Sequence, residues 1–198
     1  MEKFDMYNII NSLMMHLDNN NEKQCISLLE KYPFLLTQSL NSDGSTVFQL
    51  VVHYENFAII DYLVYEKQID IHQVDNDSEN AIFYALGKNP KIMTKLYDLG
   101  VSLNEINVIG NTPLIVSAQN GLSASLEFLI EHGANINYES NKGTSLLSIL
   151  EISRYPINFS FLMKHFDKFN EKNQKKLKKL RLKHLVERGI THEGNTSC

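Results

Sequence analysis

Apolar residues recur at helical spacing in two adjacent stretches near the middle of the chain. Side chains three or four residues apart lie on the same face of a helix. Each stretch is followed by a glycine, at positions 121 and 133, and glycine adopts the positive φ that ends many helices. The pattern predicts two helices joined by a short loop. The positions that predict it are Leu114, Ala118, Leu126, Leu129 and Ile130.

The same signals return at a fixed interval along the chain. Gly143 lies 33 residues after Gly110, and Gly133 lies 33 residues after Gly100. A period of this size is typical of repeat proteins, in which each unit buries its apolar face only against its neighbours. We therefore expect an elongated stack of helices and an all-α fold.

The start of the first stretch is the most specific motif in the sequence. It contains Thr112-Pro113-Leu114, and Pro113 suits the first turn of a helix, where a missing N–H costs nothing. With Gly133-Ala-Asn-Ile-Asn137 after the second helix, residues 107–137 resemble an ankyrin repeat. They depart from the family at Ile115, where a His usually hydrogen-bonds the start of the helix.

The resemblance implies one ankyrin-repeat solenoid over residues 1–189, made of helix–turn–helix units with short hairpin turns. In the second unit, Lys67 replaces the terminating glycine and one extra residue precedes Asp70. The expected divisions are an atypical N-terminal capping repeat at about 5–40, repeats at 41–74, 75–106, 107–139 and 140–168, a basic C-terminal helix at 169–189 and a flexible tail at 190–198.

The C-terminal helix is unusually basic. Residues 171–188 hold eight Lys or Arg against two Glu, a net charge of +6; because the whole chain carries −4, the other residues carry −10. Leu177, Leu180 and Leu185 form one arc, which predicts a capping helix that covers the last repeat and ends at Gly189. A surface for nucleic acid, an anionic membrane or an acidic partner, and a nuclear import signal, are the alternatives.

The residue types that carry catalysis in enzymes do not form a recognisable site in this sequence. Cys25 falls on a core-facing helix position, and the seven histidines lack the spacing of a zinc site. Asp75, Asp77 and Glu79 form an acidic turn, but a calcium loop also needs a glycine and a distal Glu. We expect no enzyme activity, no cofactor and no metal site.

If the resemblance holds, the side chains that face a partner come from the hairpin tips and the exposed ends of the first helices. The tips contribute Asn76, Asp77, Val108, Ile109, Asn111, Asn141 and Lys142, and the helix ends contribute His53, Tyr54, Lys88, Gln119 and Asn120.

Two of these groups are the expected anchors. Val108 and Ile109 place adjacent β-branched side chains on a turn that is normally polar, so they either pack against the neighbouring tip or contact a partner. Tyr54 is a residue type favoured at interfaces. The acidic tips, with Asp43, Asp75, Asp77 and Glu79, favour a basic partner.

The leading hypothesis is a non-catalytic adaptor, monomeric and cytoplasmic, that binds a protein on the concave face of the solenoid and takes no small-molecule substrate. An origin as a bacterial or viral effector delivered into a host cell, and a nuclear location, fit equally. The alternative is a scaffold that binds nucleic acid or an anionic membrane through residues 172–183. It is the weaker one, because no aromatic side chain lies among those lysines to stack on bases.

Overall fold

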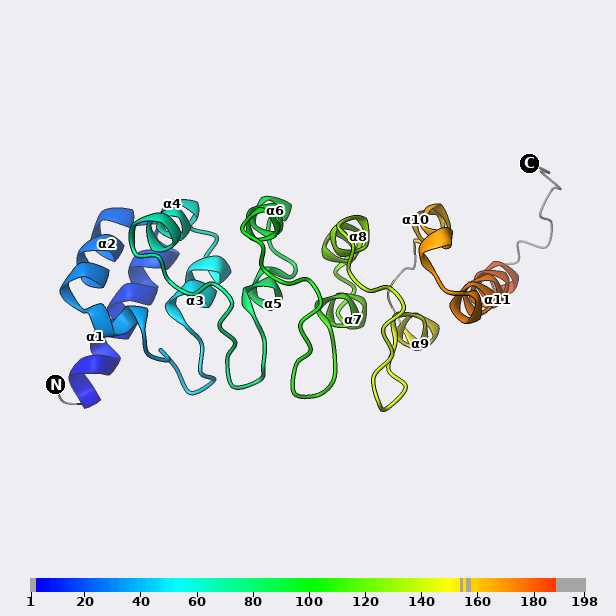
Figure 1. Ribbon diagram of the computed structural model, residues 1–198, viewed down its shortest axis with the longest axis horizontal. Helices are drawn as coiled ribbons and strands as arrows, with labels where there is room; N and C mark the ends of the chain where they lie inside the picture. The colour runs from blue at the N-terminus through cyan, green and yellow to red at the C-terminus, as the bar shows by residue number, and fades with distance from the viewer. Residues whose placement is uncertain (1–2, 154, 156–157, 188–198) are drawn as a thin grey trace.

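The computed structural model describes residues 3–153, 155 and 158–187, and within them the chain forms a row of stacked helix pairs (Figure 1). The second helices of the pairs lie along one edge, the first helices lie below them, and the hairpin loops project beyond the first helices (Figure 1). These residues contain no β-strand, only an isolated antiparallel bridge between Glu139 and Ser145. The fold is all-α, as the sequence predicted.

The helices follow one another in pairs along the chain. The N-terminal unit comprises α1 (Lys3–Asp18), α2 (Glu22–Lys31) and the 3-10 turn η1 (Pro33–Leu36). The following pairs are α3 (Val47–His53) with α4 (Phe57–Asp61), α5 (Ala81–Ala85) with α6 (Pro90–Asp98), α7 (Pro113–Gln119) with α8 (Ser123–Glu131), and α9 (Leu146–Ile152) with α10 (Phe159–Lys164). The 3-10 turn η3 (Phe166–Lys168) then leads into α11 (Glu171–Glu187).

Side-chain caps begin the short first helices. The hydroxyl oxygens of Thr46, Thr112 and Ser145 each accept a hydrogen bond from the backbone N–H three residues later, and Pro113 opens α7. Such caps satisfy N–H groups that have no partner inside the helix. Because helices this short are marginal alone, packing between neighbouring pairs must stabilise them.

The second unit ends differently from the prediction. Lys67 does not take the place of the terminating glycine, since its φ is −97° and the left-handed residue is Gln68, with φ 51°. The last turn before it, Tyr62–Glu66 (η2), is a π-helix. A π-helical turn holds one residue more than an α-helical turn, so it accommodates the extra residue seen in the sequence.

One continuous apolar core runs along the stack. Leu29, Leu63, Leu96 and Leu129, each in the second helix of a successive unit or in its π-helical continuation, are fully buried. Cys25 is also fully buried, and its burial raises the pKa of its thiol to about 11. Its predicted role in packing is confirmed, and a thiol that stays protonated is a poor nucleophile.

Helix α11 covers the end of this core. Leu177 is fully buried and Leu180 is 7% exposed, whereas Leu185 is half-buried. Gly189 and the tail at 190–198 lie outside the described residues. Among the helices that the structure describes, none is long and apolar enough to cross a membrane.

Candidate partner-binding face

The four hairpins share one local design. The first residue of each hairpin accepts, through its side-chain oxygen, the backbone N–H of the residue four positions later. The pairs are Asn41 with Ser45, Asp75 with Glu79, Asn107 with Asn111, and Ser140 with Thr144, at 2.9, 2.9, 2.9 and 3.1 Å. Asn, Asp and Ser commonly close turns in this way. In the second hairpin Ser78, with φ 60°, occupies the left-handed position that glycine holds in the other three.

The first three hairpins are joined to one another by their backbones. The N–H of Asn76 donates to the carbonyl of Asp43 at 2.9 Å, and the N–H of Val108 donates to the carbonyl of Asp77 at 2.8 Å. The amide of Asn107 also donates to Oε1 of Glu79 at 2.8 Å. These bonds hold the tips at fixed positions relative to one another.

A partly buried hydrogen-bond chain connects the first two hairpins to α5. Asn41 donates to the Ser45 hydroxyl at 3.0 Å, and that hydroxyl lies 2.6 Å from the Tyr84 oxygen. Tyr84 donates to Oδ2 of Asp75 at 2.7 Å, and burial is the main cause that raises the pKa of Tyr84. Asp75 is therefore a structural residue.

Gln49 is a structural residue that the sequence analysis missed. It stands where Ile115 stands in the third repeat, and it is fully buried. Its Oε1 accepts the N–H of Thr46 at 2.7 Å, and its Nε2 donates to the carbonyl of Glu79 at 2.7 Å. Comparing the four repeats at this position would have singled out Gln49 and Ser148 as the polar members beside Phe83 and Ile115.

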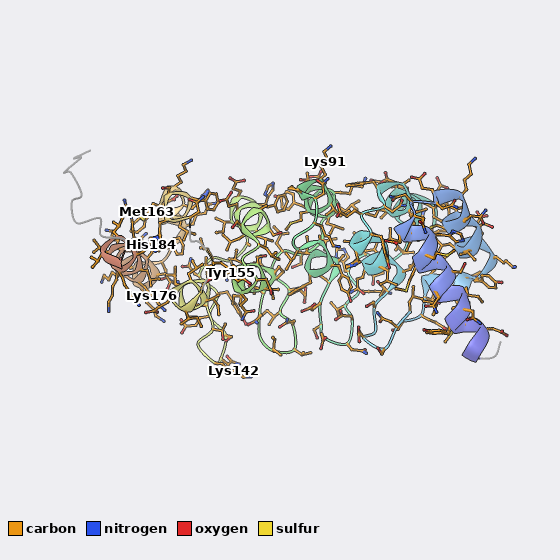
Figure 2. All side chains as sticks on the ribbon, turned by 180° about the vertical axis from the view of Figure 1, so that it is seen from behind. Lys91, Lys142, Tyr155, Met163, Lys176 and His184 are labelled. Carbon is orange, nitrogen blue, oxygen red and sulfur yellow. The ribbon has the colours of Figure 1, made fainter. Side chains whose placement is uncertain are left out.

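Most of the predicted contact residues lie on the surface. His53, Asn76, Asp77, Val108, Ile109, Gln119, Asn120, Asn141 and Lys142 are exposed, whereas Tyr54 and Lys88 are half-buried. Lys142 lies at the tip of the last hairpin (Figure 2). We call these residues, with Asp43 and the open cavity beside His53 and Lys88, the partner-binding face.

The prediction for Asn111 was wrong. Its side chain is only 4% exposed, and its Nδ2 donates to Oε1 of Gln119 at 3.1 Å. Its backbone N–H is bound by Asn107. Asn111 therefore links the hairpin to the end of α7 and is not free to contact a partner.

Val108 and Ile109 are each 61% exposed. The alternative in which they pack against the neighbouring tip is therefore wrong. Two other apolar side chains on the hairpin loops, Val74 and Ile106, are 42% and 46% exposed. The backbone bond of Val108 to Asp77 holds the tip, and the two side chains stand in solvent.

The structure brings His53 and Lys88 together at one open cavity of about 280 Å³. Glu79, Phe83, Tyr84 and Leu86 complete its lining, so it lies between α3, α5 and the second hairpin. Burial raises the pKa of Glu79, and burial followed by the charge of Lys88 lowers the pKa of His53. The cavity thus combines an apolar wall with one carboxylate and one ammonium group.

The acidic residues of the hairpins divide into two kinds. Asp43 and Asp77 are exposed, while Asp75 and Glu79 are half-buried and hydrogen-bonded inside the fold. Of these four residues, Asp43 and Asp77 present their carboxylates on the surface to an approaching molecule. Within the described residues no group of three or more His, Cys, Asp or Glu is placed to hold a metal ion.

Residues 52–140 match the family model for ankyrin repeats (3 copies). The match begins inside α3 and ends at the last hairpin, so it covers the second and third repeat pairs completely. Ankyrin repeats are protein–protein interaction modules. The capped helix pairs, their left-handed terminators and the projecting hairpins agree with that match, and this chain is an ankyrin repeat protein.

Proposed function

We propose that the protein is a non-catalytic adaptor that binds a protein partner on the partner-binding face. The observation that carries the proposal is the exposure of Val108 and Ile109, 61% each, on a tip held by a backbone hydrogen bond. Covering a Val or Ile side chain contributes about 1.5–3 kcal/mol. Because the tip is already ordered, little conformational entropy is lost when a partner covers it.

The cavity between α3 and α5 supports the same proposal. It is open to solvent, and its volume of about 280 Å³ suits one or two side chains of a partner. Glu79 and Lys88 on its wall supply one hydrogen-bond acceptor and one donor group. A partner that covers the tip of the third hairpin and inserts a side chain here would span two neighbouring repeats.

The acidic side chains of the hairpin tips indicate the charge that we expect of the partner. Asp43 and Asp77 are solvated carboxylates on adjacent tips, and the chain outside the basic helix carries −10. Complementary charge mainly accelerates encounter and makes association depend on salt. We therefore expect a basic partner whose association slows as the ionic strength rises.

Affinity capture tests the proposal. The immobilised full chain is incubated with cell lysate, captured proteins are identified by mass spectrometry, and the affinity of a purified candidate is then measured. Changing Val108 and Ile109 together to Asp should weaken binding about ten-fold, or about 1.4 kcal/mol. The circular dichroism spectrum and melting curve should stay unchanged.

A matched control uses Tyr7 and Met15, which are 63% and 53% exposed on α1. Changing both to Asp adds the same charge at the far end of the stack and should leave binding intact. Equal loss in both double variants, or full binding by V108D/I109D, would place the interface elsewhere.

A further inference from the structure

A second open groove lies at the other end of the molecule, between α9 and α11. Its volume is about 340 Å³, and its lining residues are Glu151, Lys175, Lys176, Lys179, Leu180 and Lys183. We call it the basic groove. It shares no residue with the partner-binding face, and the function proposed above makes no use of it.

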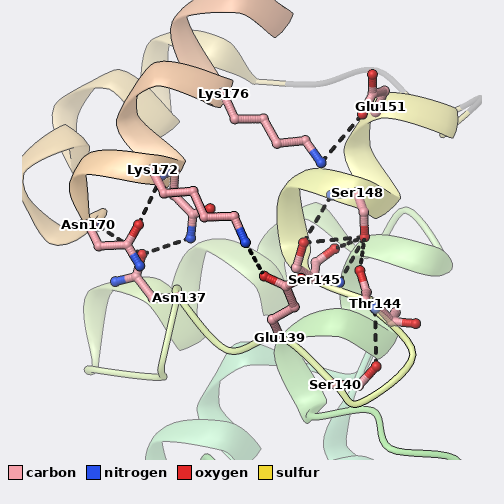
Figure 3. Close-up of polar contacts among 12 residues, drawn as sticks. Asn137, Glu139, Ser140, Thr144, Ser145, Ser148, Glu151, Asn170, Lys172 and Lys176 are labelled. Atoms are coloured by element: carbon pink, nitrogen blue, oxygen red, sulfur yellow. Dashed lines mark hydrogen bonds and ion pairs between the residues drawn. The ribbon is translucent and has the colours of Figure 1, made fainter.

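Two ion pairs hold α11 in place beside the groove. Lys172 Nζ lies 2.7 Å from Glu139 Oε2, and Lys176 Nζ lies 3.4 Å from Glu151 Oε2 (Figure 3). The first pair joins α11 to the end of the repeat at 107–139 and the second joins it to α9, so these two lysines position the helix. The hydrogen bond from Lys172, followed by the charge of the same lysine, lowers the pKa of Glu139.

Three further lysines line the groove without such a partner. Lys175, Lys179 and Lys183 are exposed, and the salt bridges found in the described part of the chain do not include them. They follow one another at intervals of four residues on one face of α11. Their Cα atoms are therefore spaced by about 6 Å along the helix axis.

Apolar side chains accompany these charges. Leu180 lines the groove, and Leu182 and Val186, on the same helix, are 55% and 68% exposed. Ile152, next to Glu151 at the end of α9, is 77% exposed. A ligand that matches this surface carries both negative charge and apolar groups, which is the chemistry of an acidic protein segment.

We propose that the basic groove binds a short extended segment of a partner protein with acidic residues at alternate positions. In an extended chain, side chains two residues apart point the same way and lie about 6.7 Å apart. This distance is close to the lysine spacing, so three alternate carboxylates pair with Lys175, Lys179 and Lys183.

Two other anionic ligands fit the groove less well. Membrane binding by a basic helix requires a broad apolar face. Leu177 and Leu180 of α11 are buried in the fold, so Leu182 and Val186 are the large apolar side chains that its described part leaves exposed. Nucleic acid binding is favoured by aromatic side chains that stack on bases, and the groove lining has none. The −10 charge of the remaining chain also repels an extended polyanion.

The test measures binding of a fluorescein-labelled peptide that contains Glu-Ala-Glu-Ala-Glu to the full chain by fluorescence anisotropy. K175Q/K179Q/K183Q should bind about ten-fold more weakly than the unchanged protein. The control K23Q/K91Q/K164Q removes the same charge at three exposed lysines outside the groove and should bind normally. V108D/I109D should also bind normally, which separates this site from the function proposed above.

Several results would overturn the proposal. If the two triple-lysine variants lose the same affinity for the peptide, net charge alone explains the binding. If a peptide with contiguous glutamates binds as tightly as the alternating one, the match to the lysine spacing is wrong. Tighter binding of duplex DNA or of phosphatidylserine vesicles would name another ligand class. Self-association that depends on these lysines, seen by light scattering, would make a second copy the occupant. Single substitutions of the same lysines decide the matter if the triple variant melts early.

Discussion

The hairpins at the N-terminal side and the junction at the C-terminal side of this stack are held together by different kinds of bond. Between the first three hairpins, backbone N–H groups donate directly to backbone carbonyls, as from Asn76 to Asp43 and from Val108 to Asp77. Between the third and fourth hairpins, and between the fourth hairpin and α11, the hydrogen bonds found in the described residues involve side chains. There Tyr138 donates through its hydroxyl to the carbonyl of Gly110 at 3.0 Å.

Asn137 is the centre of the C-terminal junction (Figure 3). Its Oδ1 accepts the N–H of Asn170 at 2.9 Å and the amide of Asn173 at 3.0 Å. Its Nδ2 donates to the carbonyl of Lys168 at 2.7 Å. One amide thus connects the end of the third repeat to the start of the capping helix.

The difference shows how a repeat array tolerates degenerate sequence in one place and not in another. A bond between backbone groups survives substitution of the side chains around it, so the second hairpin stacks although Ser78 replaces a glycine. A bond made by one amide is lost when that residue changes. We therefore expect the two regions to respond differently to the same kind of substitution.

The largest effect should come from breaking the apolar contact beneath the C-terminal junction. Leu177→Ala should cost about 2–5 kcal/mol of unfolding free energy through lost burial and a cavity, and Leu129→Ala, at an equally buried leucine, should cost as much. Hydrogen exchange should show that amide protection is lost near 140–187 in Leu177→Ala and near 107–165 in Leu129→Ala, because each repeat contacts only its neighbouring repeats. Uniform loss along the chain would contradict this.

The backbone-linked region should be most sensitive to a change that enters the space between tips. Gly44 has φ 82°, and a Cβ there would lie 2.5 Å from Oδ1 of Asn76 and 2.9 Å from its backbone N. Gly100 has φ 84° with nothing within 4 Å of the same position. Gly44→Ala and Gly100→Ala should each lower the free energy of unfolding by about 1–2 kcal/mol, because alanine is strained in the left-handed conformation. Gly44→Ala should cost about 1 kcal/mol more, because its Cβ also meets Asn76. Equal melting temperatures would show that the tips separate freely.

The side-chain-linked region should be sensitive to Asn137. Asn137→Ala removes three hydrogen bonds of a half-buried amide and should cost about 1–2 kcal/mol, measured by urea unfolding. Asn141→Ala, at an exposed tip residue, is the control and should change stability by less than about 0.5 kcal/mol. If the two variants unfold alike, Asn137 does not connect the cap to the third repeat.

The smallest expected effect is a pH dependence in the second hairpin. Burial raises the pKa of Glu79 in the folded state, so the folded chain holds its proton more tightly than the unfolded chain. Stability is therefore lost as pH rises from the unfolded pKa, about 4.3, through the raised folded value. Glu79→Gln should remove this pH dependence, so that the melting temperature stays constant across this range. The free energy of unfolding involved should be below about 1 kcal/mol, because the side chain is only half-buried. Asp77→Asn, at a solvated carboxylate, should leave the slope intact.

Local signals in the sequence determined much of the fold. The helix start at Thr112-Pro113-Leu114 was readable because proline suits the first turn of a helix, and the structure places Pro113 at the start of α7. The burial of Cys25 and Leu177 was readable from helical periodicity, which reports which face is apolar. The 33-residue period predicted stacking, because no single unit can bury its own face.

Only the tertiary structure decided which residues of the hairpins are available to a partner. Asn111 and Val108 occupy similar positions on one tip, yet Asn111 is buried against Gln119 while Val108 stands in solvent. The cavity beside His53 and the basic groove likewise join residues from separate elements. Sequence patterns report periodicity within one element, whereas these sites depend on contacts such as that between Ser45 and Tyr84, which are 39 residues apart. Such distant contacts form only when neighbouring repeats pack, so the sequence by itself identifies the array and the packing between repeats selects its binding surfaces.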